Sequence, residues 1–600
     1  MKKTLALLLC VCMLLPIISS CANAPAQRPS ELTTEPAGND TTDEIAAESD
    51  VDDMENYDPN KKTKFNHKLI VANGRTYHTV RVIGGNTSAE ETAAIQLKKY
   101  LADMNISESD KGYPITLKTD ASLKADSYKI EISGSNAEGM TISGGNGRGV
   151  LYGVFNFLEK WAGVRFFTPS LEVCYEGDIL MEPEVYEFSP VFDFRQIDGY
   201  SVQKDYRWCT KNGVNCSQWV GRFREDWGGS LGYSGPWVHS LYKLLGTSKD
   251  EQPCFTDPTV LANTIAAVRK ILKDDPDTTL ISVSQNDNDN YCTCKNCSIV
   301  MAKERSAAGP LIRFVNAVAD DIAKDYPNVT IDTLAYRWSQ TPPAVTKPRE
   351  NVCIRLCSFY CHFTQPITSD RCPENKDFRE DIVAWSKVCD NIYIWDYTIN
   401  YRFAVPTFPN LHVLRENMKF FAENNVKGVF PEGNYMSASG EFGELRAYLL
   451  AKLLTDPLMS EEEYNRHMNE FLAAYYGEGW TYIRSYIDEI CTKADSGCQS
   501  IYDSPFKAVP ATFYYGNRSK FTEYWDKAEE LAGARLKNVQ RSRLQWRYIQ
   551  LMLSKNVDDA KKLIADVEAA GVHWGETVKT LPKNLDLTKV NFMDGPDKWK

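Results

Sequence analysis

The sequence predicts an α/β fold centred on a (β/α)8 TIM barrel, preceded by a small α/β domain and followed by a helical C-terminal domain. Three observations support this fold class. Residues 61–188 mix short alternating segments, typical of strands, with segments of helical period. Between residues 189 and 457, strand-like segments alternate with helix-like ones, as in a barrel. From residue 458 to 600, apolar residues recur at three- and four-residue spacing, which indicates helices.

The first 21 residues have the pattern of a signal peptide. Lys2 and Lys3 precede an apolar run over Leu5–Ile18, and two serines then lead to Cys21. A short positive start, an apolar segment and small residues before a cleavage point describe a secretory signal that is removed from the mature protein. The position of Cys21 resembles a bacterial lipobox, which implies that Cys21 is lipidated and becomes the mature N-terminus. The alternative is an ordinary signal peptide with an incidental cysteine.

Residues 22–60 are predicted to be a disordered acidic tether. They are mostly Thr, Glu, Asp, Ala and Pro with almost no large apolar residue, so they cannot bury a core. Removal of Lys2 and Lys3 lowers the 68 basic residues to 66, against 80 acidic ones, for a mature net charge of −14. This charge argues against nucleic acid or anionic lipid as a partner.

The small α/β domain, residues 61–188, is expected to contain a strand over His78–Ile83. Ser88 is predicted to cap the next helix, with Glu91 three residues later completing a capping box. A glycine-rich turn then leads from a strand into a helix over Gly149–Trp161. The glycine spacing fits no nucleotide-binding motif, so this turn is interpreted as a tight strand-to-helix connection.

The barrel, residues 189–457, is predicted from eight strand candidates with helices between them. The second and third strands have the weakest patterns. The predicted strands are Phe192–Ile197, Gly213–Cys216, Val238–Leu241, Thr279–Ser284, Ile331–Tyr336, Val352–Cys357, Ile392–Trp395 and Gly428–Phe430. The predicted helices are Pro258–Leu272, Leu311–Lys324, Asp377–Val388 and His412–Asn424.

The helical C-terminal domain, residues 458–600, contains no residue pattern that indicates catalysis. We therefore expect any site to lie at the carboxyl ends of the barrel strands, where the loops of this fold carry function.

Acids and amides follow three of these strands. Asp287 follows the fourth strand, Asp396 ends the seventh and Glu432 follows the eighth. Carboxyl groups that face one another can protonate a glycosidic oxygen and activate water or attack directly. Each acid alone more often caps a helix or faces solvent, but three at one end of a barrel form a candidate catalytic set. Asp287 is the predicted general acid, and Glu432 or Asp396 the base or nucleophile.

Other side chains near these acids are predicted to bind substrate. Aromatic rings stack on the apolar faces of sugars, and the chain has 13 Trp and 31 Tyr. A long loop that carries Trp219 and Trp227 is a candidate wall of the sugar site. A lone histidine is more often structural, but His239 is a candidate contact for a sugar hydroxyl. The predicted substrate-binding residues are Trp395, Tyr397, His239, Asn286 and Asn434.

The cysteines form a second constellation. Cys292, Cys294 and Cys297 follow the fourth strand closely, and Cys254 is a candidate fourth partner. Four thiolates with this spacing suit structural zinc, whereas an extracellular location permits disulfides. Disulfides are favoured slightly over zinc. No catalytic metal is expected, because the cluster has no adjacent histidine, and no other cofactor is expected.

Several stretches resemble known families. GMTISGGNGRGVLYGVFNFLEKWAGVRFFTP resembles the end of the small α/β domain that precedes the barrel in β-hexosaminidases and α-glucuronidases. SVSQNDNDNYCTCKNC, IRLCSFYCHF, NIYIWDYTINY, GVFPEGN and EFGELRAYLLAKLLTDP resemble the bacterial family known as domain of unknown function 4838. The resemblance implies a glycoside-hydrolase-like barrel on a secreted bacterial protein.

The resemblance to β-hexosaminidases has a departure. Those enzymes carry an Asp-Glu pair after the fourth barrel strand, whereas this chain has Asp287-Asn288-Asp289 there. This departure argues against an acetamide-assisted mechanism. The resemblance to α-glucuronidases implies a water-activating acid late in the barrel, which Asp396 or Glu432 would supply.

The sequence therefore predicts a glycoside hydrolase that is anchored by lipid to the bacterial membrane and acts outside the cytoplasm on a polysaccharide or glycan. The alternative is a non-catalytic carbohydrate-binding lipoprotein on a degenerate barrel. The sugar, the linkage and the oligomeric state do not follow from the sequence.

Overall fold

The computed structural model describes residues 77–84, 87–135, 137–174 and 179–599. The predicted signal peptide, Cys21 and the acidic tether lie outside the described residues. Within the described residues, no helix combines the length and the apolar character that a membrane span requires.

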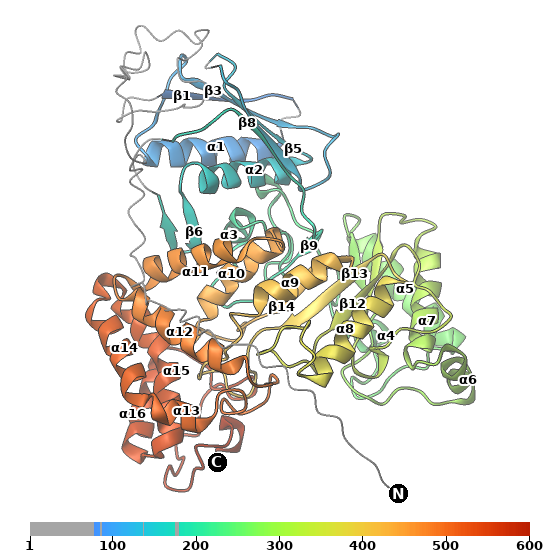
Figure 1. Cartoon of the computed structure of the whole chain (residues 1–600). Coiled ribbons are helices and arrows are strands. Elements are labelled where there is room, and N and C mark those ends of the chain that lie inside the picture. Colours follow the sequence, from blue (N-terminus) through green and yellow to red (C-terminus); the bar gives the residue numbers. More distant parts are fainter. Residues whose placement is uncertain (1–76, 85–86, 136, 175–178, 600) are drawn as a thin grey trace, which may run out of the picture. The chain divides into compact units, whose positions relative to one another are not determined.

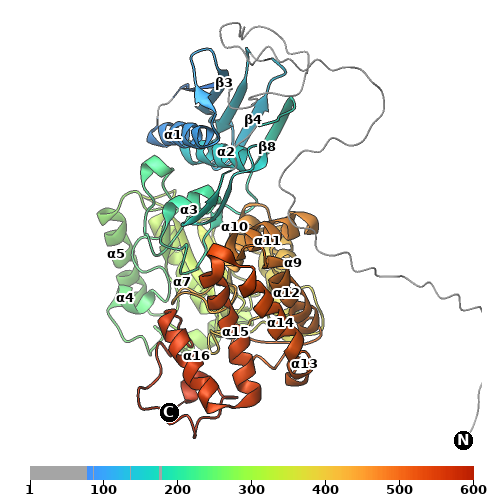
Figure 2. The same cartoon turned by 90° about the vertical axis from the view of Figure 1, so that its left-hand side faces the viewer.

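The first sheet has six strands in the order β2-β1-β3-β5-β4-β8, and helices α1 and α2 cover one of its faces (Figure 1, Figure 2). The predicted cap of α1 is wrong by one residue, because Thr87 is the N-cap and Glu90 completes the capping box. The elements of this region are β1 (Tyr77–Val82), α1 (Ser88–Asp103), β2 (Ser107–Glu108), β3 (Tyr113–Thr119), β4 (Tyr128–Ile132), β5 (Met140–Gly144), α2 (Gly147–Lys160) and β8 (Glu184–Phe188). A separate hairpin consists of β6 (Arg165–Thr168) and β7 (Leu171–Val173).

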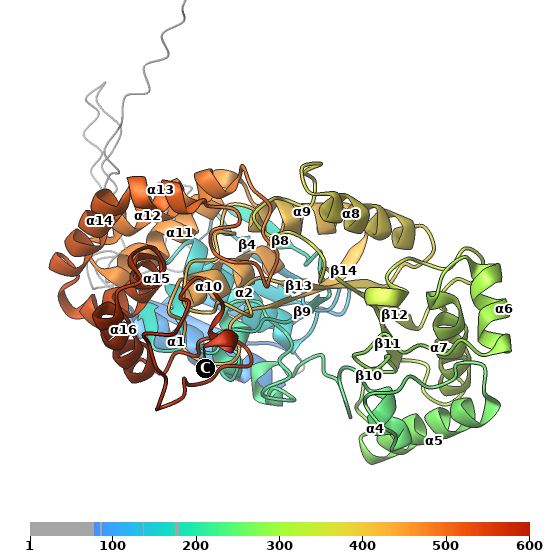
Figure 3. The same ribbon diagram turned by 90° about the horizontal axis from the view of Figure 1, so that it is seen from below.

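The second sheet is parallel and curled, with the strand order β10-β11-β12-β13-β14-β9 (Figure 3). Parallel strands buried on both faces are expected to be continuously apolar, and β12 and β13 are buried along their whole length. The strands are β9 (Phe194–Arg195), β10 (Leu280–Ser282), β11 (Thr330–Ala335), β12 (Val352–Cys357), β13 (Ile392–Tyr397) and β14 (Val426–Glu432).

Two predicted strands differ from the structure. Gly213–Cys216 contributes only an isolated parallel bridge, between Gln196 and Cys216. Val238–Leu241 is not a strand, because His239 has a left-handed backbone (φ 45°) and helix α4 (Leu241–Leu245) begins there. In place of the predicted strand, Tyr233 pairs with the start of β10 through a parallel bridge to Leu280. A short apolar run does not distinguish strand from helix, which explains the error.

Helices surround the second sheet, and further helices follow its last strand along the chain (Figure 3). α7 packs on β11 and β12, α9 on β14, and α10 on β9. The larger of two buried apolar clusters runs from this sheet into the later helices, so both share one core. The helices are α3 (Tyr206–Lys211), α5 (Pro258–Asp274), α6 (Lys295–Glu304), α7 (Ala308–Ile322), α8 (Pro373–Ser386), α9 (Leu414–Glu423), α10 (Gly443–Thr455), α11 (Glu461–Tyr476), α12 (Trp480–Ala494), α13 (Ala511–Gly516), α14 (Arg518–Glu530), α15 (Leu536–Ser554) and α16 (Val557–Ala569).

A buried ionic cluster connects the first sheet region to β9. Asp126 accepts hydrogen bonds from Arg148 on α2 (2.8 Å) and from Arg195 on β9 (2.9 Å). Asn215 donates to the same carboxylate at 3.0 Å. The two guanidinium groups and the amide hold the pKa of Asp126 well below its usual value despite its burial, so this carboxylate is charged in the folded protein.

Candidate functional site

Asp198 and Glu432 lie next to each other at the carboxyl ends of β9 and β14. These strands pair in parallel, and the amide of Asp198 donates to the carbonyl of Pro431 at 3.3 Å. In this register Asp198 lies opposite Glu432, on strands separated by about 4.8 Å. We call these two residues the carboxylate pair.

Glu432 is 9% exposed and accepts a hydrogen bond from Trp395 Nε1 at its Oε2 atom (2.7 Å). Burial raises the pKa of Glu432 to about 8, and the nearby charge of Asp198 also raises it. The indole hydrogen bond acts in the opposite direction, because it favours the charged form. Glu432 therefore holds a proton at neutral pH.

Asp198 is 3% exposed and has two side-chain donors. Trp219 Nε1 donates to Oδ1 at 2.8 Å, and Gln218 Nε2 donates to Oδ2 at 3.2 Å. Burial raises the pKa of Asp198 to about 7, while these two hydrogen bonds lower it. Asp198 is thus the more readily ionised member of the carboxylate pair.

The carboxylate pair holds about one proton near neutral pH, since its pKa values are about 7 and about 8. Neighbouring carboxylates disfavour double ionisation, so a protonated acid and a carboxylate coexist. Groups with pKa values near the working pH are the most effective general acids and bases. The arrangement can therefore donate a proton from one group and accept or attack with the other.

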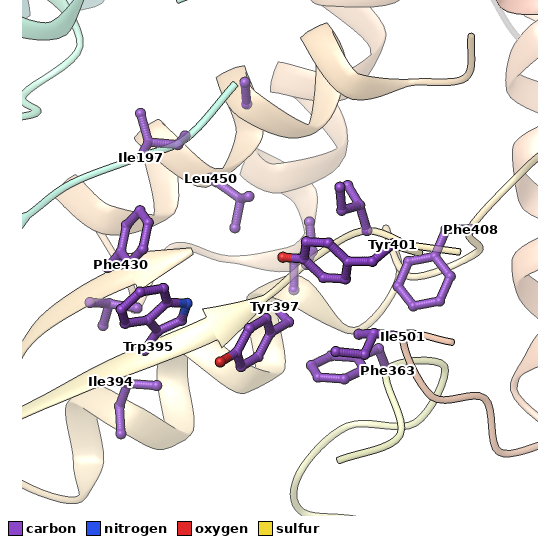
Figure 4. Close-up of a cluster of buried hydrophobic side chains, with 14 of the residues drawn as sticks. Ile197, Phe363, Ile394, Trp395, Tyr397, Tyr401, Phe408, Phe430, Leu450 and Ile501 are labelled. Atoms are coloured by element: carbon purple, nitrogen blue, oxygen red, sulfur yellow. The ribbon is translucent and has the colours of Figure 1, made fainter. Parts of the chain in front are cut away.

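Trp395 and Tyr397 lie on the same face of β13, next to the carboxyl end of β14 (Figure 4). In the β13–β14 register Trp395 lies opposite Phe430, and Tyr397 lies opposite Glu432. Trp395 also stacks on Trp237 with ring centroids 4.9 Å apart. Both side chains are almost fully buried, at 9% and 8% exposure. These buried rings therefore help to position Glu432, and neither offers a free face to a sugar.

A more exposed ring lies beside Asp198. Trp219 is 40% exposed and stacks on Tyr435 with centroids 5.9 Å apart. Because its indole nitrogen is also the donor to Asp198, this ring is held directly against the carboxylate pair. Trp227, from the same predicted loop, packs instead in the core of the first sheet region.

Asp396 lies on the other face of β13. Side chains alternate along a strand, so Asp396 points away from the side that Trp395 and Tyr397 share. Ser358 Oγ donates to Asp396 Oδ1 at 2.6 Å. Burial raises the pKa of Asp396 to about 6. The structure therefore does not bring Asp396 together with the carboxylate pair.

Asp287 lies in the loop after β10 with a side chain that is 58% exposed. Tyr336 Oη donates to Asp287 Oδ1 at 3.2 Å, and Arg337 Nη1 lies 3.5 Å from the same atom. Asp287 is also close enough to raise the pKa of Glu576 by its charge. It therefore lies at the exposed rim of the site, paired with a guanidinium.

His239 is near this rim. Its Nδ1 atom lies 2.8 Å from the carbonyl of Gln285, which suits a neutral ring that donates from Nδ1, and burial lowers its pKa. His239 and Arg337 both have left-handed backbones, with φ values of 45° and 55°. Such strain in residues other than glycine concentrates at functional sites.

The two predicted amides have internal partners. Asn286 accepts from the amide of Tyr242 (3.0 Å) and donates to the carbonyl of Glu251 (2.5 Å), so its side chain connects two loops. Asn434 donates to the carbonyl of Ser437 at 3.0 Å. Both side chains use these groups to hold local structure.

Residues after α12 also reach the site, although the sequence indicated no catalytic residue there. The amide of Glu576 donates to the carbonyl of Tyr401 at 2.7 Å, and Tyr435 Oη donates to Glu576 Oε1 at 3.2 Å. Desolvation raises the pKa of Glu576. Tyr502, which is 43% exposed, packs on Tyr401 with centroids 6.1 Å apart.

Sequence reasoning missed Asp198, Tyr435, Tyr502 and Glu576, whereas it had named Trp219 as part of a candidate wall of the sugar site. Asp198 carried a usable signal, because it directly follows the first predicted barrel strand as Glu432 follows the last. Glu576 had none, since its segment reaches the site only through contacts with residues far away in the chain, such as Tyr401 and Tyr435.

The four predicted cysteines come together. The sulfur atoms of Cys254, Cys292, Cys294 and Cys297 lie within 4.8 Å of one another. They are free thiols, and the disulfide found among the described residues joins Cys372 to Cys498. This group can hold a metal ion and lies apart from the carboxylate pair in the chain.

Several solved structures of glycoside hydrolases resemble the chain weakly. A GH138 enzyme targeting pectin rhamnogalacturonan II has a TM-score of 0.44 and 11% identity, covering 82% of this chain and 73% of its own. A GH20 exo-β-N-acetylglucosaminidase from Vibrio harveyi has a TM-score of 0.40 and 12% identity, covering 72% and 78%. A family 89 glycoside hydrolase from Clostridium perfringens has a TM-score of 0.40 and 11% identity, covering 80% and 64%.

No curated protein is significantly similar to the chain in sequence. The sequence profile described as domain of unknown function (DUF4838) matches residues 182–488, which include β9 to β14 and the carboxylate pair. The chain belongs to the DUF4838 family.

Proposed function

We propose that this protein is a glycoside hydrolase in which the carboxylate pair carries out catalysis. The observation that carries the proposal is the position of Asp198 and Glu432 on neighbouring strands, with pKa values of about 7 and about 8. Glycoside hydrolysis requires an acid that is protonated at working pH and a second carboxylate that is ionised. Burial and mutual repulsion supply both states here.

The roles follow from the two environments. Glu432 has the higher pKa and donates its proton to the glycosidic oxygen as the C–O bond breaks. Asp198 has two hydrogen-bond donors that favour its charged form, so it is the nucleophile and forms a glycosyl ester with the anomeric carbon. The Glu432 carboxylate then takes a proton from water, which hydrolyses the ester and returns both groups to their starting states.

The stereochemical outcome follows from the strand spacing. Retaining enzymes place their carboxyl groups about 5–5.5 Å apart, and inverting enzymes about 6.5–9.5 Å apart. Adjacent strands about 4.8 Å apart favour the shorter separation. We therefore expect retention of configuration at the anomeric carbon.

The curled sheet supplies the scaffold for this proposal. We infer that the segments around Cys216 and Tyr233 complete an eight-stranded barrel. The amide of Asn215 donates to the carbonyl of Arg195, and the amide of Leu231 donates to the carbonyl of Asn215. The bridge between Tyr233 and Leu280 then leads back to β10. In a barrel, catalytic residues lie at the carboxyl ends of strands, as the carboxylate pair does.

Substrate binding is assigned to the rings and rim residues around the pair. Trp219 offers an exposed face next to Asp198, and Tyr502 is similarly exposed on the side of Glu576. Such rings bind the apolar faces of sugars. Asp287 and His239 lie at the rim, where they are placed to bind sugar hydroxyl groups.

The place of action proposed from the sequence is the outer side of a bacterial membrane, with the protein anchored through lipid on Cys21. Incorporation of a radiolabelled fatty acid tests this. The label is expected in the wild-type chain and absent from the Cys21→Ser variant. Labelling of both chains, or of neither, would contradict the lipid anchor.

The catalytic proposal is tested on the full chain with a panel of 4-nitrophenyl glycosides and polysaccharides. Asp198→Asn and Glu432→Gln should each lower turnover by about 10²–10⁴-fold. Asp396→Asn is the matched control, because Asp396 is equally buried but lies on the opposite face of β13. Thermal unfolding confirms that each variant is folded.

Substrates with better leaving groups separate the two roles. Glu432→Gln should lose much less activity on a 2,4-dinitrophenyl glycoside than on a polysaccharide, because this leaving group needs no proton. Full turnover by Asp198→Asn and Glu432→Gln would refute the assignment. If Asp287→Asn alone abolished turnover, the acid would instead be Asp287. Binding of an oligosaccharide that is recovered uncut would indicate a carbohydrate-binding protein.

A further inference from the structure

Four cysteines from two loops converge beside α5 and α6. Cys254 lies just before α5, while Cys292, Cys294 and Cys297 lie in the loop after β10 and the first turn of α6. Cys254 Sγ is 3.8 Å from Cys294 Sγ and 3.7 Å from Cys297 Sγ. All four sulfur atoms lie within 4.8 Å of one another.

These distances match a tetrahedral tetrathiolate. With zinc–sulfur bonds of about 2.3 Å, the sulfur atoms of a tetrahedral site are about 3.8 Å apart. A disulfide requires a separation of about 2.05 Å. The sulfur atoms are therefore spaced for a common central ion rather than for a bond between two of them. We propose that Cys254, Cys292, Cys294 and Cys297 bind one structural zinc ion.

Polar groups surround three of the four sulfur atoms. The amide of Cys297 approaches Cys294 Sγ at 3.5 Å, and Thr256 Oγ1 lies 3.3 Å from Cys297 Sγ and 3.4 Å from Cys254 Sγ. These donors can stabilise negative sulfur. Cys294 is the N-cap of α6, and Asp257 is the N-cap of α5. The positive ends of both helix dipoles therefore face a site whose four thiolates and one Zn²⁺ carry a net charge of −2.

Disulfide chemistry occurs elsewhere in the described residues. Cys372 and Cys498 form a disulfide, whereas the four clustered cysteines remain free. Cys254 Sγ is about equally far from Cys294 Sγ and Cys297 Sγ. These distances therefore favour no particular disulfide pair within the cluster. A bound metal ion would protect all four thiols in an oxidising compartment.

The zinc ion would clamp the loop that carries Asp287. Gln252 already ties the two loops together, since its Nε2 atom donates to the carbonyls of Asn286 (2.7 Å) and Asn288 (3.1 Å). Asn290 Nδ2 donates to the carbonyl of Asp250 at 3.0 Å. The four cysteines form a further contact between the same two loops. The zinc ion is a structural clamp, because four thiolates leave no open coordination position.

Metal analysis of the secreted full-length protein tests the proposal without any activity assay. Plasma mass spectrometry should find one zinc per wild-type chain and a large loss of zinc in Cys294→Ser. Cys174→Ser is the matched control, because Cys174 is a free, partly exposed thiol outside the cluster, and it should retain one zinc.

Thiol labelling gives a second readout on the wild-type chain. The four cluster cysteines should resist alkylation until a zinc chelator is added and then react together. Zinc-free wild-type protein, iron in place of zinc, or peptide mapping that shows disulfides among these four cysteines would overturn the proposal. Each of these results leaves the glycosidase proposal to its own test, since none measures turnover.

Discussion

The raised pKa of Glu432 makes the free energy of unfolding depend on pH. Replacement of Glu432 by glutamine tests this dependence. Glutamine has nearly the same shape and keeps an oxygen that can accept the Trp395 hydrogen bond, but it cannot ionise. Burial and the charge of Asp198 raise the pKa of Glu432 from its usual 4.5 to about 8. In the unfolded chain the same group releases its proton near the usual value.

The sign and size follow from proton linkage. Between pH 4.5 and about 8 the folded state keeps a proton on Glu432 that the unfolded chain has released, so the free energy of unfolding falls as pH rises. The loss is about 1.4 kcal/mol per pH unit and reaches about 5 kcal/mol at its end. Glu432→Gln lacks this loss. Relative to wild type, the variant should therefore gain up to about 5 kcal/mol of stability as pH rises through this range, and then level off.

Urea unfolding followed by tryptophan fluorescence at pH 5, 6, 7 and 8 measures the effect. The midpoint of Glu432→Gln should move upward relative to wild type at each step. Glu416→Gln is the control, because Glu416 is an exposed residue on α9, and its difference from wild type should not follow the same trend. A constant difference between Glu432→Gln and wild type from pH 5 to 8 would refute the buried, protonated state of Glu432.

Four further results are expected. The pH profile of kcat/KM should be bell-shaped, with limbs near the two pKa values of about 7 and about 8. Trp395→Phe should move the alkaline limb upward by about one pH unit, because it removes a hydrogen bond to the charged form of Glu432. Asp126→Ala should cost about 3–5 kcal/mol in urea unfolding, because two buried arginines lose their partner. That cost should shrink as pH falls below the usual aspartate pKa of 3.8, where the folded state loses the benefit of the charged carboxylate. Replacement of Cys372 and Cys498 by serine should lower stability by up to about 5 kcal/mol, from the sequence separation of 126 residues that the disulfide closes. Non-reducing thermal unfolding checks this value, and an unchanged midpoint would contradict it.

The sequence predicted the long elements well. The predicted helix over Pro258–Leu272 is α5, and the predicted strand over Val352–Cys357 is β12. Both carry strong patterns, one of helical period and one of apolar residues that only Arg355 interrupts. Prediction failed at Val238–Leu241, where four residues have too few positions to reveal a period and the backbone of His239 is left-handed.

The sequence analysis identified Glu432 but not Asp198, and the reason is the topology of the sheet. Glu432 was identified because an acid at the end of a strand is a usual catalytic position. Asp198 lies just past the end of β9 and carried the same signal of an acid after a strand, but nothing in the local sequence relates it to Glu432. Only the parallel pairing of β9 with β14, the first and last strands of that sheet along the chain, makes the two residues neighbours.

The alternation of side chains along β13 explains why Asp396 does not join the carboxylate pair. Trp395, Asp396 and Tyr397 are consecutive, and consecutive side chains on a strand point to opposite faces. If Trp395 and Tyr397 shape the sugar site, then Asp396 cannot face it. The structure follows this rule, since Trp395 contacts Glu432 while Asp396 contacts Ser358. The same rule, applied to the register of β9 and β14, puts Asp198 and Glu432 on one face. Strand parity is therefore a stronger criterion for choosing catalytic acids than their presence at strand ends alone.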